Sequence, residues 1–155
     1  MRKIMVKFMN EDSQKQKSLA ITICEDITAI VAAIPGAENA EMDLVPEYDL
    51  SQITGLKIVL APHGYVRSNK GAADRSGPDQ SVKIDLAIMK KCSNKSEIPD
   101  LLAFSETIVK GVDRKSVQDG FVTGVENDPL YDANIFRSMK VFITTLSINI
   151  KVLSR

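Results

Sequence analysis

The sequence of 155 residues predicts an α+β fold, in which one domain has a mainly antiparallel or mixed β-sheet and two α-helices packed on one face. Two stretches repeat apolar residues every three or four positions, which is typical of helices with one buried face. Several other stretches alternate apolar and polar residues, which is typical of half-buried strands. The predicted strands are joined mostly by connections of hairpin or loop length, and such connections favour antiparallel pairing.

The first helix is predicted from about Ser13 to Ile34. Asp12 or Ser13 can cap its start, and the proline and glycine at 35–36 stop it. Cys24 falls on the apolar stripe of this helix, so we expect a small buried thiol rather than a reactive one. The stripe consists of Ala20, Ile23, Cys24, Ile27, Ile30, Val31 and Ile34.

Three strands are predicted between this helix and the next one. The first lies near 41–45, and the second covers 56–61 and ends before Pro62. The segment from about 65 to 80 is rich in glycine and small polar residues, so it is expected to be a flexible loop. The third strand is SVKIDLAIMKK, in which Val82, Ile84, Leu86 and Ile88 face one way and Lys83, Asp85, Ala87 and Met89 face the other.

The second half of the chain predicts a helix in SEIPDLLAFSETIVKGV, a short strand in FVTGV and a long final strand at 139–153. Pro99 falls in the first turn of the helix, where its missing N–H costs little. The final strand is the longest of the predicted strands, so part of it is expected to extend beyond its partner. Its buried face is expected to hold Phe142, Leu146, Ile148 and Ile150, and its other face Thr145, Ser147, Asn149 and Lys151.

No arrangement typical of catalysis or metal binding is recognisable in the sequence. His63 is the only histidine, and Cys24 and Cys92 form no CxxC pair. The glycine-containing stretch GAADRSGPD lacks the Lys–Ser/Thr pair of a phosphate-binding loop and leads into a strand instead of a helix. We therefore expect no enzyme and assign no catalytic, cofactor-binding or metal-binding residue.

The charge balance excludes broad electrostatic binding as the basis of function. Lys plus Arg and Asp plus Glu each number 20, so the formal net charge is zero. This argues against a broad basic surface for nucleic acid or anionic membranes. No apolar run is long enough to span a membrane, and we expect a cytoplasmic protein. One local exception is the 65–80 loop, where Arg67, Lys70 and Arg75 suggest a docking element for assembly.

The segment VENDPLYDANIF gathers acids and a tyrosine around a single proline. Asp128-Pro129 is a strong turn signal, Asn127 can bond to nearby backbone, and Asp132 can cap the short helical turn that follows. Tyr131 can cover the end of the sheet. The oxygen ligands do not alternate around a glycine as a calcium loop requires, so the segment is interpreted as a structural corner.

Taken in order, these pieces resemble the tail terminator (tail completion, minor tail protein U-like) family of long-tailed bacteriophages. The resemblance runs roughly from Ser18 to Val152 through the first helix, DLSQITGLKIVLAP, the Arg-containing loop, VKIDLAIMKK, EIPDLLAFSETI, VENDPLYD and FITTLSINIKV. It implies a structural virion protein of the tail or neck, assembled in the host cytoplasm. Such proteins form a ring, commonly of six copies, that caps the tail tube, stops its polymerisation and receives the head connector.

The resemblance also implies the partners: other copies of the chain, the tail tube protein and the head–tail connector, with DNA passing through the ring without sequence-specific binding. The far end of the final strand, with Ser147, Asn149 and Lys151, is the predicted seam between subunits, because an unpaired strand edge can pair with another chain. Two alternatives remain open. One is another ring-forming connector or tail tube component, and the other is a small cytoplasmic enzyme or binding domain without a recognisable motif.

Overall fold

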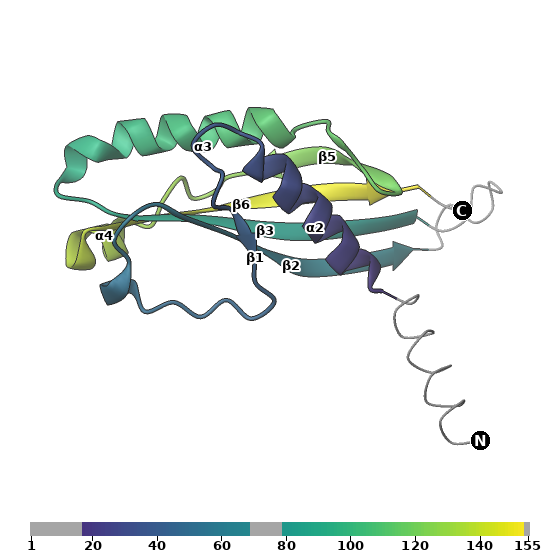
Figure 1. The fold of residues 1–155 in the computed structure, drawn as a ribbon, viewed down its shortest axis with the longest axis horizontal. Coiled ribbons are helices and arrows are strands. Elements are labelled where there is room, and N and C mark those ends of the chain that lie inside the picture. Colours follow the sequence, from purple (N-terminus) through teal and green to yellow (C-terminus); the bar gives the residue numbers. More distant parts are fainter. Residues whose placement is uncertain (1–16, 69–78, 154–155) are drawn as a thin grey trace, which may run out of the picture.

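The computed structural model describes residues 17–68 and 79–153, which form an α+β domain around one six-stranded mixed sheet (Figure 1). The strands lie in the order β1-β2-β3-β6-β5-β4. Among the described helices, none is long and apolar enough to cross a membrane. The elements are α2 (Leu19–Ala32), β1 (Glu41–Met42), η1 (Leu50–Gln52), β2 (Lys57–Ser68), β3 (Asp79–Lys91), η3 (Lys95–Glu97), α3 (Ile98–Val112), β4 (Ser116–Val117), β5 (Gly120–Glu126), α4 (Ala133–Met139) and β6 (Val141–Val152).

The two predicted helices, α2 and α3, bury their apolar stripes in one core with β2, β3 and β6, as expected. Helix α2 begins at Leu19 instead of Ser13, because Ser18 has an extended backbone with ψ 132°. The predicted caps Asp12 and Ser13 lie outside the described residues. The helix ends at Ala32, and the chain then turns through Gly36, whose φ of 91° suits glycine.

The two helices also pack closely against each other near the end of α3. A Cβ atom built on Gly111 would lie 2.5 Å from Cδ1 of Ile34. The absence of a side chain at Gly111 therefore lets the segment after α2 approach α3.

The same core includes Ser105, whose buried hydroxyl donates a hydrogen bond of 2.9 Å to the carbonyl of Leu101 one helical turn earlier.

Strand β2 continues through Pro62 to Ser68, so the prediction that it ends before Pro62 is wrong. The reason is its position: β1 covers β2 only at Val59 and Leu60, and beyond them the outer edge of β2 has no neighbouring strand among the described residues. At such an edge the missing N–H of proline breaks no ladder bond. The predicted 65–80 loop is thus strand at both ends, and 69–78 lie outside the described residues.

Strands β3 and β6 form the centre of the sheet and pair along residues 80–91 and 141–152. The predicted alternation is confirmed, since the side chains that were expected to face the helices are fully buried. The prediction that β6 is the longest strand is wrong, because β3 has 13 residues and β6 has 12. Part of β6 does extend beyond a partner, because residues 141–146 pair with β3 but not with β5. The predicted seam is wrongly placed, however, since Ser147, Asn149 and Lys151 pair with β3 on one side and with β5 on the other.

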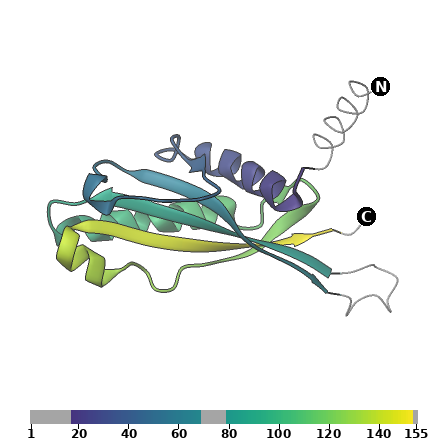
Figure 2. The same ribbon diagram turned by 90° about the horizontal axis from the view of Figure 1, so that it is seen from below.

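The opposite face of the sheet is covered at one end only. There Ile53, Val59, Met89 and Val141 form a second buried cluster, to which the segment 43–56 and α4 contribute partly buried side chains. Met89 does face away from α2 and α3, as its place in the alternation predicts, but this cluster buries it. The other end of this face, near the paired ends of β2 and β3, lies away from α4 (Figure 2).

Candidate assembly surfaces

Both cysteines are buried, whereas His63 is exposed on β2. Burial raises the pKa of the Cys24 thiol to about 11, and burial together with Glu97 raises that of Cys92. His63 is the extra residue at a register shift in β2, where its Nδ1 lies 2.5 Å from Oδ2 of Asp85. Among the described residues, no three His, Cys, Asp or Glu side chains form a group able to hold a metal ion.

The outer edge of β2 is the first surface suited to pairing with another chain. Beyond Leu60, no described strand lies beside β2 on its outer side. This edge carries two exposed apolar side chains, Tyr65 at 48% and Val66 at 61% exposure. The Tyr65 hydroxyl donates to Oε1 of Gln80 on β3, a contact that ties the edge to its inner neighbour. An exposed apolar strand edge is a template for association with a further strand.

The outer edge of β5 is the second such surface, on the other side of the sheet. Strand β4 covers β5 only at Gly120 and Phe121, and the N–H of Val122 donates to the carbonyl of Lys115. Residues 123–126 have no described strand on their outer side. Because β2, β3, β6 and β5 are antiparallel in succession, β2 and β5 run in opposite directions. The two edges are therefore compatible with antiparallel pairing between identically oriented copies.

The predicted corner at 127–132 packs on β6 and starts α4. The Asp132 carboxylate caps α4 by accepting a hydrogen bond of 3.0 Å from the N–H of Ile135, which confirms the expected cap. The Tyr131 ring stacks on the ring of Phe142 at 5.9 Å between centroids. Asn127 accepts a hydrogen bond from the buried Thr144, while the exposed Asp128 precedes Pro129 through a cis peptide bond.

The residues predicted for the assembly loop and for the seam lie near the ends of β2, β3 and β6. Arg67 is exposed on β2, whereas Lys70 and Arg75 lie outside the described residues. Asn149 and Lys151 are on the sheet face opposite α2 and α3, where they line a hollow of about 320 Å³. Val66, Ser68, Asp79, Ser81 and Thr123 complete most of its lining. The structure thus places Asn149 and Lys151 in a hollow shared with the open strand β2 and places none of the three predicted seam residues on an edge.

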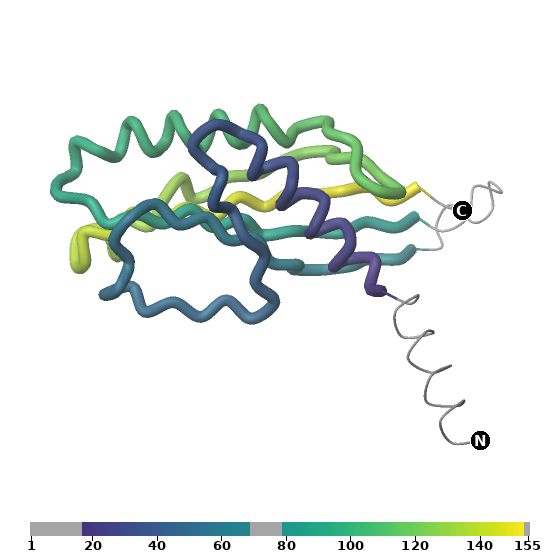
Figure 3. Tube along the Cα trace, viewed as in Figure 1, coloured from purple at the N-terminus to yellow at the C-terminus, as the bar shows by residue number. Residues whose placement is uncertain are grey.

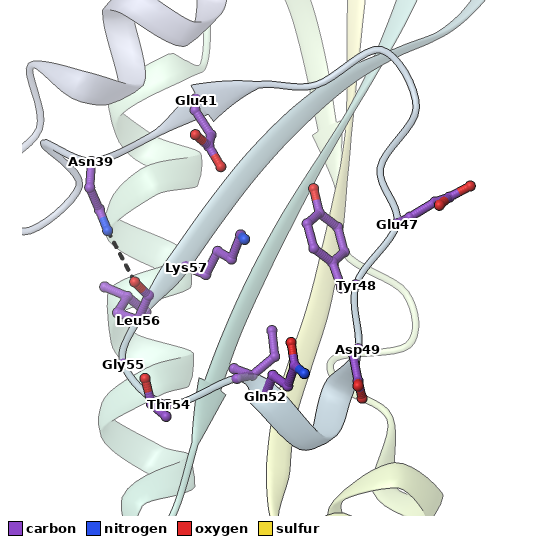
Figure 4. A pocket seen from close by; sticks show the side chains of 11 residues that line it. Asn39, Glu41, Glu47, Tyr48, Asp49, Gln52, Thr54, Gly55, Leu56 and Lys57 are labelled. Carbon is purple, nitrogen blue, oxygen red and sulfur yellow. Dashed lines mark hydrogen bonds between the residues drawn. The ribbon is translucent and has the colours of Figure 1, made fainter.

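A surface that the sequence reasoning missed is the wide loop of residues 43–56, which leaves the sheet after β1 and returns to it at β2 (Figure 3). The loop and the adjacent strands enclose an open hollow of about 630 Å³. Its polar lining includes Glu41, Glu47, Tyr48 and Asp49 (Figure 4). The signal in the sequence was a local excess of acids: residues 38–57 hold Glu38, Glu41, Asp43, Glu47 and Asp49 but one basic residue, Lys57.

No protein-family model matches the sequence, and no curated protein matches it significantly. Among solved structures, the fold is similar to a chain of the virion of a native gene transfer agent particle. That likeness has a TM-score of 0.50 at 12% identity and covers 88% of this chain and 96% of the other, so it concerns the fold alone. A second match is the sheath/tube terminator of PVC, an extracellular contractile injection system, in its extended state. The two sequences are 10% identical, and the match covers 90% of this chain and 57% of the other. Its TM-score of 0.37 does not establish a common fold.

Proposed function

We propose that this chain is a structural subunit of a phage-tail-like particle, and that its copies form the ring that terminates the tail tube. The observation that carries the proposal is the pair of open strand edges, on β2 and β5, at opposite sides of one sheet. The fold resembles that of a chain in a gene transfer agent virion, and this supports the assignment to a phage-tail-like particle. The order of the sequence pieces resembles tail terminators, and this supports a position at the end of the tail tube.

In the proposed ring, the β2 edge of each subunit pairs with the β5 edge of the next. This contact joins two different surfaces, and such head-to-tail contacts close into a ring when the rotation between copies allows it. Tyr65 and Val66 lose their exposure in the contact, which favours it through apolar burial. A closed ring leaves no edge free, so its lateral growth stops. The resemblance to tail terminators suggests six copies.

The two ends of the ring would then meet different partners. One end stops the tail tube protein, and the other offers a docking surface to the head–tail connector. DNA passes through the lumen without sequence-specific contacts, and a zero formal net charge is compatible with such passage because the ring does not hold the phosphates tightly. In this role the protein belongs to the virion and acts without catalysis.

The proposal is tested with one variant on each edge. Val66→Lys places a charge on the exposed β2 edge, and charged side chains on edges block strand pairing. Gly124→Lys does the same on β5, where an added Cβ meets no atom within 4 Å and the backbone φ is not in the left-handed region. Oligomeric state is measured by light scattering after chromatography, with Leu130→Lys as a control at an exposed apolar side chain outside both strands.

The expected result is that each edge variant alone is monomeric while the Leu130→Lys control forms the same ring as the unmodified chain. A mixture of the two edge variants should give heterodimers, since each still has one intact edge that fits the intact edge of the other. Rings formed by either edge variant would refute the pairing of β2 with β5. A folded, unmodified chain that stays monomeric both at high concentration and in the presence of tail tubes would refute the ring itself.

A further inference from the structure

The loop 43–56 forms a hollow whose two walls differ in origin. One wall comes from the loop, where Tyr48 faces the strands while the side chains of Glu47 and Asp49 point outward at the rim, and the other comes from the strands and carries Glu41 and Lys57 (Figure 4). The hollow measures about 630 Å³ and opens to solvent. It therefore has room for one or two side chains of another segment.

The Tyr48 hydroxyl in this wall lacks a hydrogen-bond partner among the described residues, although its oxygen is shielded from solvent. Shielded polar groups nearly always have a partner in native proteins. Burial, with Asp43 and Glu41, raises the pKa of Tyr48 to about 12, so the hydroxyl keeps its proton and can donate as well as accept. The Lys57 ammonium lies 4.8 Å from the centroid of the Tyr48 ring and occupies that face. The hydroxyl is therefore available to a polar group that enters the hollow.

The surroundings define the chemistry of that partner. Residues 38–57 carry five carboxylates against one ammonium in a chain that is neutral as a whole. Beside the hollow, Leu44 and Val45 are exposed by 55% and 69%. A segment that fits this surface combines cationic side chains with apolar ones, because the cations complement the carboxylates and the apolar groups cover Leu44 and Val45.

The chain itself contains such a segment. Residues 2–9 read RKIMVKFM, with three basic residues, no acid and five apolar side chains. We propose that the hollow of the 43–56 loop is the docking site for this N-terminal segment of the same chain. The proposal is independent of the ring, since it requires one copy only.

The connection between the segment and the site is long enough. Residues 1–16 join Lys17, which leads into α2, and α2 packs on β1 and β2, the two strands that flank the loop. Helix α2 is roughly 21 Å long at 1.5 Å per residue. With residues 2–9 in the hollow, residues 10–16 form the link to Lys17 and can span up to about 25 Å, slightly more than the length of α2, so the segment can return along α2 to the hollow. A tether of this length also keeps the segment at a high effective concentration near its own hollow.

The experiment attaches a nitroxide spin label to Met5→Cys in the full chain and measures the broadening of backbone amide signals by NMR. The native thiols Cys24 and Cys92 are buried, so the introduced thiol reacts first. The pocket variant is Glu41→Gln/Glu47→Gln, because neither carboxylate has a hydrogen-bond partner among the described residues. The control is Glu106→Gln/Asp113→Asn, two exposed acids on and after α3. A mixture of spin-labelled protein with unlabelled, nitrogen-15-enriched protein reports contacts between copies.

Docking within one chain predicts broadening of the amides of residues 44–57 in the labelled protein. The pocket variant should weaken this broadening about threefold or more, as should high salt, while the control variant leaves it unchanged. The proposal is overturned if these amides stay sharp, or if both double variants weaken the broadening equally. Broadening that occurs in the mixed sample as strongly as in the labelled protein would assign the docking to a neighbouring copy and overturn the same-chain contact.

Discussion

The hydroxyl of Thr144 donates a hydrogen bond of 2.8 Å to Oδ1 of Asn127, and this bond fastens the corner at 127–132 to the middle of β6. Thr144 is 1% exposed, whereas Asn127 is partly exposed. The two partners therefore differ in what they lose when the other is removed. A buried hydroxyl has no access to water, but a partly exposed amide oxygen does.

Asn127→Ala is expected to destabilise the fold more than Thr144→Val. The first change leaves the buried Thr144 hydroxyl without its acceptor, at a cost of about 1–3 kcal/mol in the free energy of unfolding. The second removes the buried polar group itself and keeps the volume, so we expect it to cost about 1 kcal/mol or less. Urea unfolding of the two variants measures the difference. The opposite order would show that the bond does not hold the corner.

Asp132→Ala is expected to cost about 1 kcal/mol, the usual effect of removing an N-cap. The Asp132 carboxylate accepts a hydrogen bond of 3.0 Å from the N–H of Ile135. Deleting the carboxylate leaves this N–H at the start of α4 without its acceptor. The neighbouring acid of the corner provides the control, since Asp128 is exposed. Asp128→Ala should change the unfolding free energy by less than about 0.5 kcal/mol. Equal costs for both variants would contradict the capping role of Asp132.

Acidification should weaken the fold in part through Glu97. The Oε2 atom of Glu97 accepts a hydrogen bond of 2.5 Å from the N–H of Ser93, and its Oε1 atom accepts one of 3.3 Å from Nζ of Lys90. The bond from Ser93 is the main reason that the pKa of Glu97 lies below the ordinary 4.5. A carboxyl with a lowered folded pKa contributes stability that is present above the unfolded pKa and is lost as pH falls through the folded one.

The test compares Glu97→Gln with the unmodified chain in urea unfolding across the acidic range. The unmodified chain should lose stability as pH falls below 4.5 towards the folded pKa of Glu97, and the variant should lose less over the same window. Parallel curves for the two proteins would mean that protonation of Glu97 does not contribute to acid sensitivity.

Asn149→Pro is expected to destabilise the monomer instead of affecting assembly alone. Asn149 pairs with Lys83 on β3 and with Gly124 on β5, so a proline removes a ladder donor inside the sheet. The loss should be roughly 2 kcal/mol or more, since one backbone group of a partner strand is left unpaired as well. Asn149→Ala keeps the N–H and serves as the control in thermal unfolding. Equal melting temperatures for the two variants would place this part of β6 at a free edge after all.

The sequence by itself determined the elements whose signal is local. The stripes of α2 and α3 follow from apolar residues at three- and four-residue spacing, and the buried faces of β3 and β6 follow from strict alternation. The Asp132 cap follows from an acid placed just before a short helical stretch. Each of these features depends on side chains within a few residues of one another, so the order of residues contains the information.

The tertiary structure alone decided which strands are at an edge. Alternation indicates the face on which a side chain lies, but it contains no information on the neighbours of a strand, because both sides of the backbone look alike in the sequence. For this reason the sequence predicts a free edge at Ser147, Asn149 and Lys151, although β5 pairs with them. It likewise predicts that a strand ends before Pro62, although β2 continues along an open edge. The hollow of the 43–56 loop has the same origin, since Glu41 and Lys57 meet Tyr48 across it only after β1 pairs with β2.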